Sequence, residues 1–89
     1  MYDASQKLRI DYALNAFSIP DSRKWHKDNT VTVKYNYGNR KGIWTIQKFT
    51  LKTIENLNKH GFIVGVTNKL DSKKGKFFEI RFYVNEMVG

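Results

Sequence analysis

The apolar residues of the N-terminal segment recur with the period of an α-helix. Four of them are spaced i, i+3, i+4 and i+7 and so share one helix face: Ile10, Ala13, Leu14 and Phe17. Asp3 and Gln6 stand three positions apart, as the two residues of an N-terminal capping box do. Pro20 is expected to end the helix, because proline pushes the residue before it out of the α conformation. The pattern predicts a core-packing helix between Asp3 and Pro20.

A period of two in the middle of the chain predicts a β-strand. Its alternating apolar residues are Val31, Val33, Tyr35 and Tyr37. A shorter alternation recurs in Ile43–Phe49, and the glycines of Gly38–Gly42 allow a turn between the two runs. We therefore predict a β-hairpin over Thr30–Phe49, with Arg40 and Lys41 at its exposed tip.

A second helix is predicted from Thr50 to His60. Its apolar residues are spaced i, i+3 and i+6: Leu51, Ile54 and Leu57. Either Thr50 or Thr53 can cap its N-terminus. Gly61 stands where a glycine commonly ends a helix, and Phe62 can make the apolar contact that accompanies such an end.

Two further strands are expected in Phe62–Thr67 and Phe77–Val84, joined by the basic segment Asn68–Lys76. One side of the last strand is wholly apolar, and aromatic residues also occur on its mixed side, which is typical of a strand in the centre of a sheet. The apolar side consists of Phe78, Ile80, Phe82 and Val84. A chain of 89 residues supports one core. The sequence thus predicts a single α+β domain over residues 1–89, with αββαββ order and an antiparallel sheet packed on two helices.

Charge makes the picture more specific. Sixteen Lys and Arg residues against eight Asp and Glu residues give a net charge of +8, with a pI near 9.8. Such a balance favours polyanionic partners, and nucleic acid above all. Lysine outnumbers arginine, and lysine lacks the bidentate fork that reads guanine, so the sequence favours phosphate affinity over sequence specificity.

The candidate nucleic-acid contacts lie in the two basic loops and on the second predicted helix. Lys52, Asn56 and Lys59 fall on one side of that helix, with Glu55 at the edge of the group, and a simply solvated face is the alternative. The whole candidate set is Arg40, Lys41, Lys52, Asn56, Lys59, Lys69, Lys73, Lys74 and Lys76. Phosphate neutralisation by the loop tips is the expected mechanism.

Asp21–Asn29 lacks periodicity and is expected to be a loop. Within it, Trp25 stands between Arg23, Lys24 and Lys27. An exposed Trp among cations can stack on a base. Alternatively, Trp25 folds back over the core while the cations stay solvated.

The order of helix, glycine, apolar strand, basic loop and aromatic strand resembles the second half of winged-helix DNA-binding domains. The matching stretches are "LKTIENLNKHGF" for the helix and "NKLDSKKGK" for the wing, together about 35 residues. Because a hairpin is expected where winged-helix domains have another helix, the overall element order is closer to the double-wing C-terminal domain of the phage transcription factor MotA. This resemblance implies a DNA-binding, phage-type transcription regulator in which strands and wings contact DNA.

Binding to a protein is the alternative to nucleic-acid binding. A small modulator acting on an acidic face of a host nucleic-acid enzyme is the alternative, because thirteen aromatics exceed what so small a core must bury. Its anchors would be Trp25, Tyr35, Tyr37 and Tyr83. An exposed edge at Thr30–Tyr37 would also allow a homodimer.

An enzyme is not expected. The eight acids and the two histidines show no metal-ligand spacing, and the chain has no cysteine. A metal-independent ribonuclease using His, Lys and Arg is the one catalytic alternative. We expect no cofactor and no metal. Apolar runs are too short to span a bilayer, and the basic residues lie in loops and not on an amphipathic helix. A cytoplasmic protein without membrane partners is therefore predicted.

Overall fold

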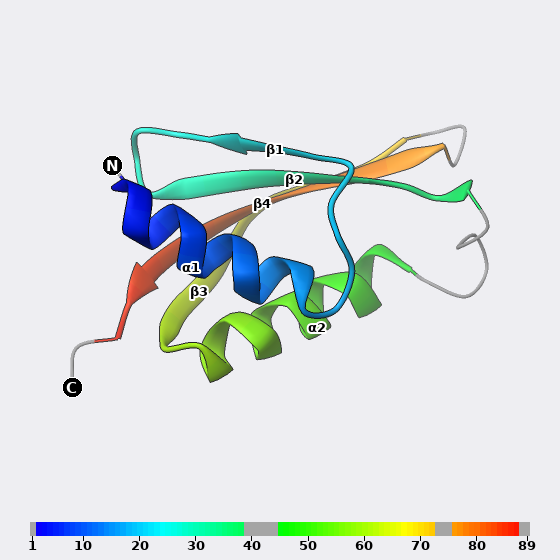
Figure 1. Ribbon diagram of the computed structural model, residues 1–89. Helices are drawn as coiled ribbons and strands as arrows, with labels where there is room; N and C mark the ends of the chain where they lie inside the picture. The colour runs from blue at the N-terminus through cyan, green and yellow to red at the C-terminus, as the bar shows by residue number, and fades with distance from the viewer. Residues whose placement is uncertain (1, 39–44, 73–75, 88–89) are drawn as a thin grey trace.

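Four antiparallel strands form one sheet in the order β1-β2-β4-β3 (Figure 1). The structure is a computed structural model and describes residues 2–38, 45–72 and 76–87. Within these ranges the elements are α1 (Ala4–Asn15), β1 (Ser22–Trp25), β2 (Thr30–Asn36), α2 (Ile46–Lys59), β3 (Phe62–Asp71) and β4 (Phe77–Glu86). The predicted α+β class and αββαββ order are confirmed.

The topology consists of two αββ halves. α1, β1 and β2 form the first half, and α2, β3 and β4 form the second. In each half the two strands pair as an antiparallel hairpin. The halves join where β2 pairs antiparallel with β4, with Thr30 opposite Tyr83 and Asn36 opposite Phe77. This pairing makes β2 and β4 the central strands and leaves β1 and β3 at the edges.

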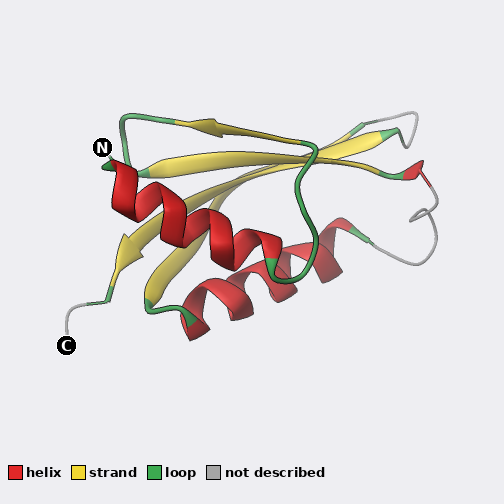
Figure 2. Cartoon of the chain, in the orientation of Figure 1, coloured by secondary structure: helices red, strands yellow, loops and turns green. Residues whose placement is uncertain are grey.

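Both helices cover the same face of the sheet (Figure 2). Alternate residues of β2 and β4 point to this face and are buried, as are residues from both helices. The largest fully buried side chains are Tyr35, Phe49, Phe62, Phe78, Phe82, Ile10, Leu14, Leu57, Ile80, Val31, Val33 and Val84. The residues between them on β2 and β4 point to the other face, which no helix of the described chain covers.

The first helix begins as predicted and ends earlier. The Asp3 carboxylate accepts the Gln6 backbone N–H at 2.8 Å, and the Asp3 N–H donates to Gln6 Oε1 at 3.0 Å, which completes a capping box. The helix ends at Asn15, so the prediction that Pro20 stops it was wrong. Phe17, the last residue of the predicted stripe, lies beyond the helix and packs edge-to-face on Phe49 with ring centroids 5.3 Å apart.

The first hairpin lies earlier in the chain than predicted. Ser22–Trp25 is a strand, so the expectation that Asp21–Asn29 is entirely a loop was wrong. β1 pairs with β2, with Trp25 opposite Val31, and the His26 N–H donates to the Thr30 carbonyl at 3.0 Å to close the turn. Asn29 takes a left-handed conformation there, with φ of 61°, which asparagine tolerates better than most residues.

The prediction that Ile43–Phe49 forms the return strand of a hairpin was wrong, because α2 already begins at Ile46. Thr45 is its N-cap, and its hydroxyl accepts the Lys48 N–H at 3.1 Å. Thr50 and Thr53, the predicted caps, are instead buried. The stripe that faces the core runs through Phe49, Thr50, Thr53 and Leu57, whereas Leu51, from the predicted stripe, is 61% exposed.

In the second half of the chain the end of α2 and the place of β4 follow the prediction, but β3 continues to Asp71, so the prediction that Asn68–Lys76 is wholly a loop was wrong. Gly61 ends the helix in a left-handed conformation with φ of 89°, and Phe62 behind it is buried. β4 is a central strand with its Phe78–Val84 side in the core. β2 is also central, so the prediction that Thr30–Tyr37 offers a free edge for a homodimer was wrong.

Candidate nucleic-acid interface

The two basic segments of the chain leave the sheet from neighbouring points. The Tyr37 backbone N–H, where β2 ends, donates to the carbonyl of Lys76, just before β4, at 2.9 Å. The Tyr37 hydroxyl donates to Asp71 Oδ1, also at 2.9 Å. We call this end of the sheet, marked by Tyr37, Asp71 and Lys76, the basic end. Gly38 follows β2 there, and the rest of the predicted tip, residues 39–42, lies outside the described residues.

Asp71 is the single acidic residue of Asn68–Lys76, and at the basic end its carboxylate is hydrogen-bonded. Asp71 accepts the hydroxyl hydrogen bond of Tyr37, which turns its carboxylate toward the core side of the sheet. Burial, and then the hydrogen bond to Asp71, raise the pKa of the Tyr37 phenol to about 12. Tyr37 is therefore a neutral donor at ordinary pH, and Asp71 remains paired with it.

The predicted loop residues fall into two groups. Lys69 and Lys76 are exposed at the basic end. The Lys76 N–H donates to the Ser72 hydroxyl at 2.9 Å, and the Phe77 N–H donates to the same oxygen at 3.2 Å, so Ser72 ties the two sides of the turn together. The other predicted loop residues, Arg40, Lys41, Lys73 and Lys74, lie outside the described residues.

Of the predicted helix residues, Lys59 is set apart from the basic end. Lys59 is near the start of β3, and Lys69 is near its far end, so the length of β3 separates them by roughly 20 Å or more. Lys52 and Lys59 both approach Glu55, at 3.7 and 3.3 Å. The hydrogen bond from Lys59 and the charge of Lys52 lower the pKa of Glu55. Asn56 is half-buried between them, so this helix face is partly neutralised within the chain.

Trp25 packs toward the core. Its ring lies edge-to-face with Tyr2, with centroids 5.4 Å apart, and Lys7 Nζ is 5.8 Å from its centroid. The indole is half-buried against the core cluster. This placement favours the core-capping interpretation of Trp25 over base stacking.

Sequence reasoning missed the uncovered face of the sheet as a candidate site. We call this surface the open face; its paired β2 and β4 residues are Thr30, Thr32, Lys34, Asn36, Phe77, Glu79, Arg81 and Tyr83. Lys34 Nζ lies 4.4 Å from the Phe77 ring centroid, a cation–π contact. The signal was present in the sequence, because the alternation of both strands already separated these residues from the core. The missing step was the pairing of β2 with β1 and β4.

Arg81 is fixed on the open face by two partners. Its Nε donates to Thr30 Oγ1 at 2.9 Å, and its Nη2 donates to Asp28 Oδ2 at 3.0 Å. The hydrogen bond from Thr30, and then the charge of Arg81, lower the pKa of the Asp28 carboxyl. The guanidinium plane is thus held in place on the sheet.

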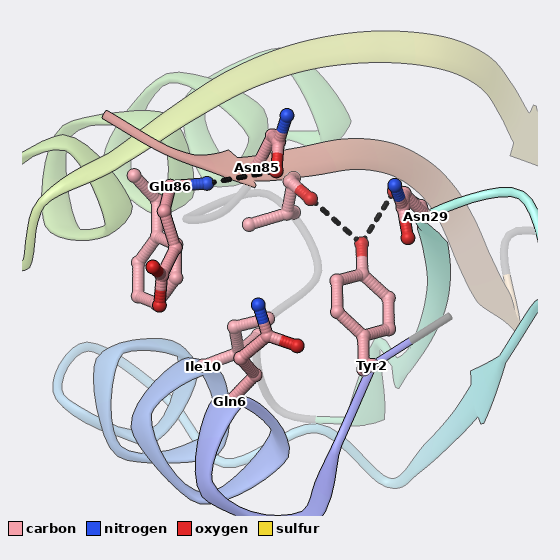
Figure 3. Close-up of a pocket in the computed structure, with 8 residues that line it drawn as sticks. Tyr2, Gln6, Ile10, Asn29, Asn85 and Glu86 are labelled. Atoms are coloured by element: carbon pink, nitrogen blue, oxygen red, sulfur yellow. Dashed lines mark hydrogen bonds between the residues drawn. The ribbon is translucent and has the colours of Figure 1, made fainter. Parts of the chain in front are cut away.

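A small polar pocket lies at the opposite end of the molecule (Figure 3). It has a volume of about 130 Å³ and includes Tyr2, Asn29 and Glu86 in its lining. The Tyr2 hydroxyl is within hydrogen-bonding distance of the Val84 and Asn29 carbonyls, and burial raises its pKa to about 12. Glu86 forms an ion pair with Arg9. The polar groups of this pocket are therefore engaged in contacts that hold α1 to β4.

Two further findings concern metals and membranes. Among the residues that the structure describes, no three His, Asp or Glu side chains gather as metal ligands would. Neither described helix has the length and apolar character needed to cross a bilayer.

Comparisons of the chain with protein-family models, with curated proteins and with solved structures found no match.

Proposed function

We propose that the protein is a non-enzymatic nucleic-acid-binding domain, with DNA as the preferred partner, that contacts phosphates at its basic end. The observation that carries the proposal is the hydrogen bond from Tyr37 to Lys76, because it brings the end of β2, which Arg40 and Lys41 follow in the sequence, next to Lys76 at the start of β4. We infer that it acts as a phage-type regulator of transcription. Its expected location is the cytoplasm, in association with the nucleoid.

Charge supports this assignment. The net charge of +8 favours a polyanion, and the carboxylate of Asp71 is occupied by Tyr37. Lys69 and Lys76 make no ion pair with another described residue, whereas Lys52 and Lys59 share Glu55. Lysines act as point charges on phosphates, so we expect affinity with little sequence preference.

A salt titration tests the proposal. Binding of labelled duplex DNA would be measured at several salt concentrations for the unaltered protein, for Lys69→Ala/Lys76→Ala, and for the matched control Lys52→Ala/Lys59→Ala, which removes the same charge. Each lost phosphate contact should flatten the log–log salt slope by about 0.9. We expect Lys69→Ala/Lys76→Ala to flatten the salt slope by nearly the amount that two lost phosphate contacts would give. The control Lys52→Ala/Lys59→Ala should flatten it less. Equal effects, or no salt-sensitive binding to duplex DNA, single-stranded DNA or single-stranded RNA, would contradict the proposal.

A protein-binding modulator is the second candidate, and the surface of α1 supports it. Tyr35 and Tyr37, which were predicted as anchors, are buried. Leu8 and Tyr12 on α1 are each 71% exposed, and Tyr12 lies edge-to-face with His60 at 5.4 Å. Stoichiometric capture of one protein from nuclease-treated lysate, lost on Leu8→Lys and retained in Lys69→Ala/Lys76→Ala, would favour this candidate.

A further inference from the structure

We propose that the open face of the sheet binds single-stranded nucleic acid, with bases on its β3–β4 half and phosphates along its β1–β2 half. This inference rests on the proposed function and specifies the form of the nucleic acid. It starts from the arrangement of the layers, since both helices lie on one face of the sheet and leave the other uncovered (Figure 2).

The β1–β2 half of the open face is cationic. Lys24 and Lys34 lie there on adjacent strands, and neither forms an ion pair with another described residue. A hollow of about 390 Å³ runs between them, lined by Ser22, Arg23, Lys24, His26, Thr32, Lys34 and Glu79. Glu79 is the one acid of this lining. A phosphate in this hollow would meet two lysines, with Glu79, opposite Lys34 in the β2–β4 register, as the one acid beside them.

The β3–β4 half carries the apolar and aromatic residues of the open face, together with Glu79 and Arg81. Ile63 and Leu70 on β3 are 51% and 49% exposed, and Tyr83 on β4 is 37% exposed. Phe77 is half-buried, and Lys34 Nζ lies over one face of its ring. Neighbouring strands are about 4.8 Å apart, so the backbones of β2 and β1 lie about 5 and 10 Å to the side of β4, while the Lys34 side chain reaches back over Phe77. This lateral offset matches a strand whose bases rest on one half and whose backbone follows the other.

The aromatic residues are spaced for several unstacked bases. Phe77 and Tyr83 point to the same face of β4 and are about 20 Å apart along the strand. Arg81 lies between them, with its guanidinium plane held by Thr30 and Asp28, and such a plane can also stack on a base. A duplex stacks its bases on one another and offers no free base face to these side chains. The row therefore favours single strands.

Gly65 leaves the side of Tyr83 accessible. It lies directly opposite Tyr83 in the β3–β4 register, and a Cβ atom added at this glycine would meet no heavy atom within 4 Å. Cross-strand neighbours normally cover each other, with Cβ atoms about 5 Å apart. Glycine is otherwise unfavourable within a strand, and here its effect is free space beside the Tyr83 ring, where a base can lie.

The test uses single-stranded DNA, single-stranded RNA and duplex DNA of about 12 nucleotides, a length within the range of single-strand sites, with fluorescence anisotropy as the readout. Gly65→Val fills the space beside Tyr83 while improving strand propensity, so the fold should persist in thermal unfolding. Tyr83→Leu removes the stacking ring and keeps an apolar side chain. We expect the unaltered protein to bind either single strand more tightly than duplex, and each variant to weaken that binding roughly tenfold.

A second pair of variants tests the cationic half. Glu79→Gln and Glu55→Gln each remove one negative charge, but only Glu79 lies in the hollow. Glu79→Gln should therefore tighten single-strand binding more than Glu55→Gln does. Tighter binding of duplex, or single-strand binding that both Gly65→Val and Tyr83→Leu leave unchanged, would overturn this inference while leaving the proposed function in place. Absence of salt-sensitive binding to all three nucleic acids would overturn both.

Discussion

The Tyr2 hydroxyl lies 2.9 Å from the carbonyl oxygen of Val84 and thereby joins the second residue of the chain to its last strand. The same hydroxyl also approaches the carbonyl of Asn29, and the ring packs edge-to-face on Trp25. One side chain thus ties the start of α1 to β1, to the β1–β2 turn and to β4.

Tyr2→Phe should lower the free energy of unfolding by about 1 kcal/mol, because a buried hydrogen bond is lost while the ring contacts remain. Urea denaturation measures this loss. Tyr12→Phe is the matched control, since Tyr12 is 71% exposed and should change stability little. Equal losses in the two variants would mean that the Tyr2 hydroxyl contributes nothing specific.

Thr45→Ala should cost about 1 kcal/mol of stability, because the N-cap hydroxyl that accepts the Lys48 N–H is removed. Thr45→Val should cost a similar amount, and Thr45→Ser should cost little. Chemical denaturation of the three variants distinguishes a helix cap from the strand that the local alternation predicts. In a strand, Thr45→Val would be neutral or stabilising.

Alkaline pH should destabilise the fold through Tyr2 and Tyr37. The pKa of each phenol is about 12 in the folded protein, against an ordinary value of 10.0. Between these values the unfolded chain releases both protons while the folded chain keeps them, so the free energy of unfolding falls as pH rises. The double variant Tyr2→Phe/Tyr37→Phe has neither phenol and should show a shallower fall. Parallel pH profiles would contradict the prediction.

Acid should remove the contribution of Asp28. Thr30 and Arg81 lower the pKa of this carboxyl below its ordinary 3.8, so its stabilising effect is complete above that value and is lost as pH falls through the lowered pKa. Asp28→Asn should therefore be less stable than the unaltered protein at neutral pH, and the difference should shrink in strong acid. A difference that stays constant across this range would show that the contact between Asp28 and Arg81 does not depend on charge.

Local patterns were sufficient where one face of an element is buried and its period is unambiguous. The side of β4 from Phe78 to Val84 and the glycine end of α2 at Gly61 could be read in this way. The start of α2 could not, because Trp44, Thr45, Ile46 and Gln47 alternate as a strand would. The helix is favoured by the local cap at Thr45 and by the burial of Phe49, and only the second depends on packing.

The strand β1 could not be predicted from the sequence for a related reason. Ser22, Arg23 and Lys24 have little strand character of their own, and they become a strand by pairing with β2. The lysines of the basic end could be anticipated from charge alone. The sharing of Glu55 by Lys52 and Lys59, and the length of β3 between Lys59 and Lys69, follow from three-dimensional positions that spacing along the chain does not reveal.

The joint between the two αββ halves has a consequence for the order in which the chain assembles. The hairpins β1–β2 and β3–β4 connect residues that are close in sequence, and such hairpins form in about 1–10 μs. The β2–β4 ladder instead brings Thr30 to Tyr83 across an intervening helix and strand. Loop-closure entropy must be overcome before this ladder gains any contact. We therefore expect the two hairpins to form quickly and to pair with each other more slowly. The folding transition state should involve the pairing of β2 with β4.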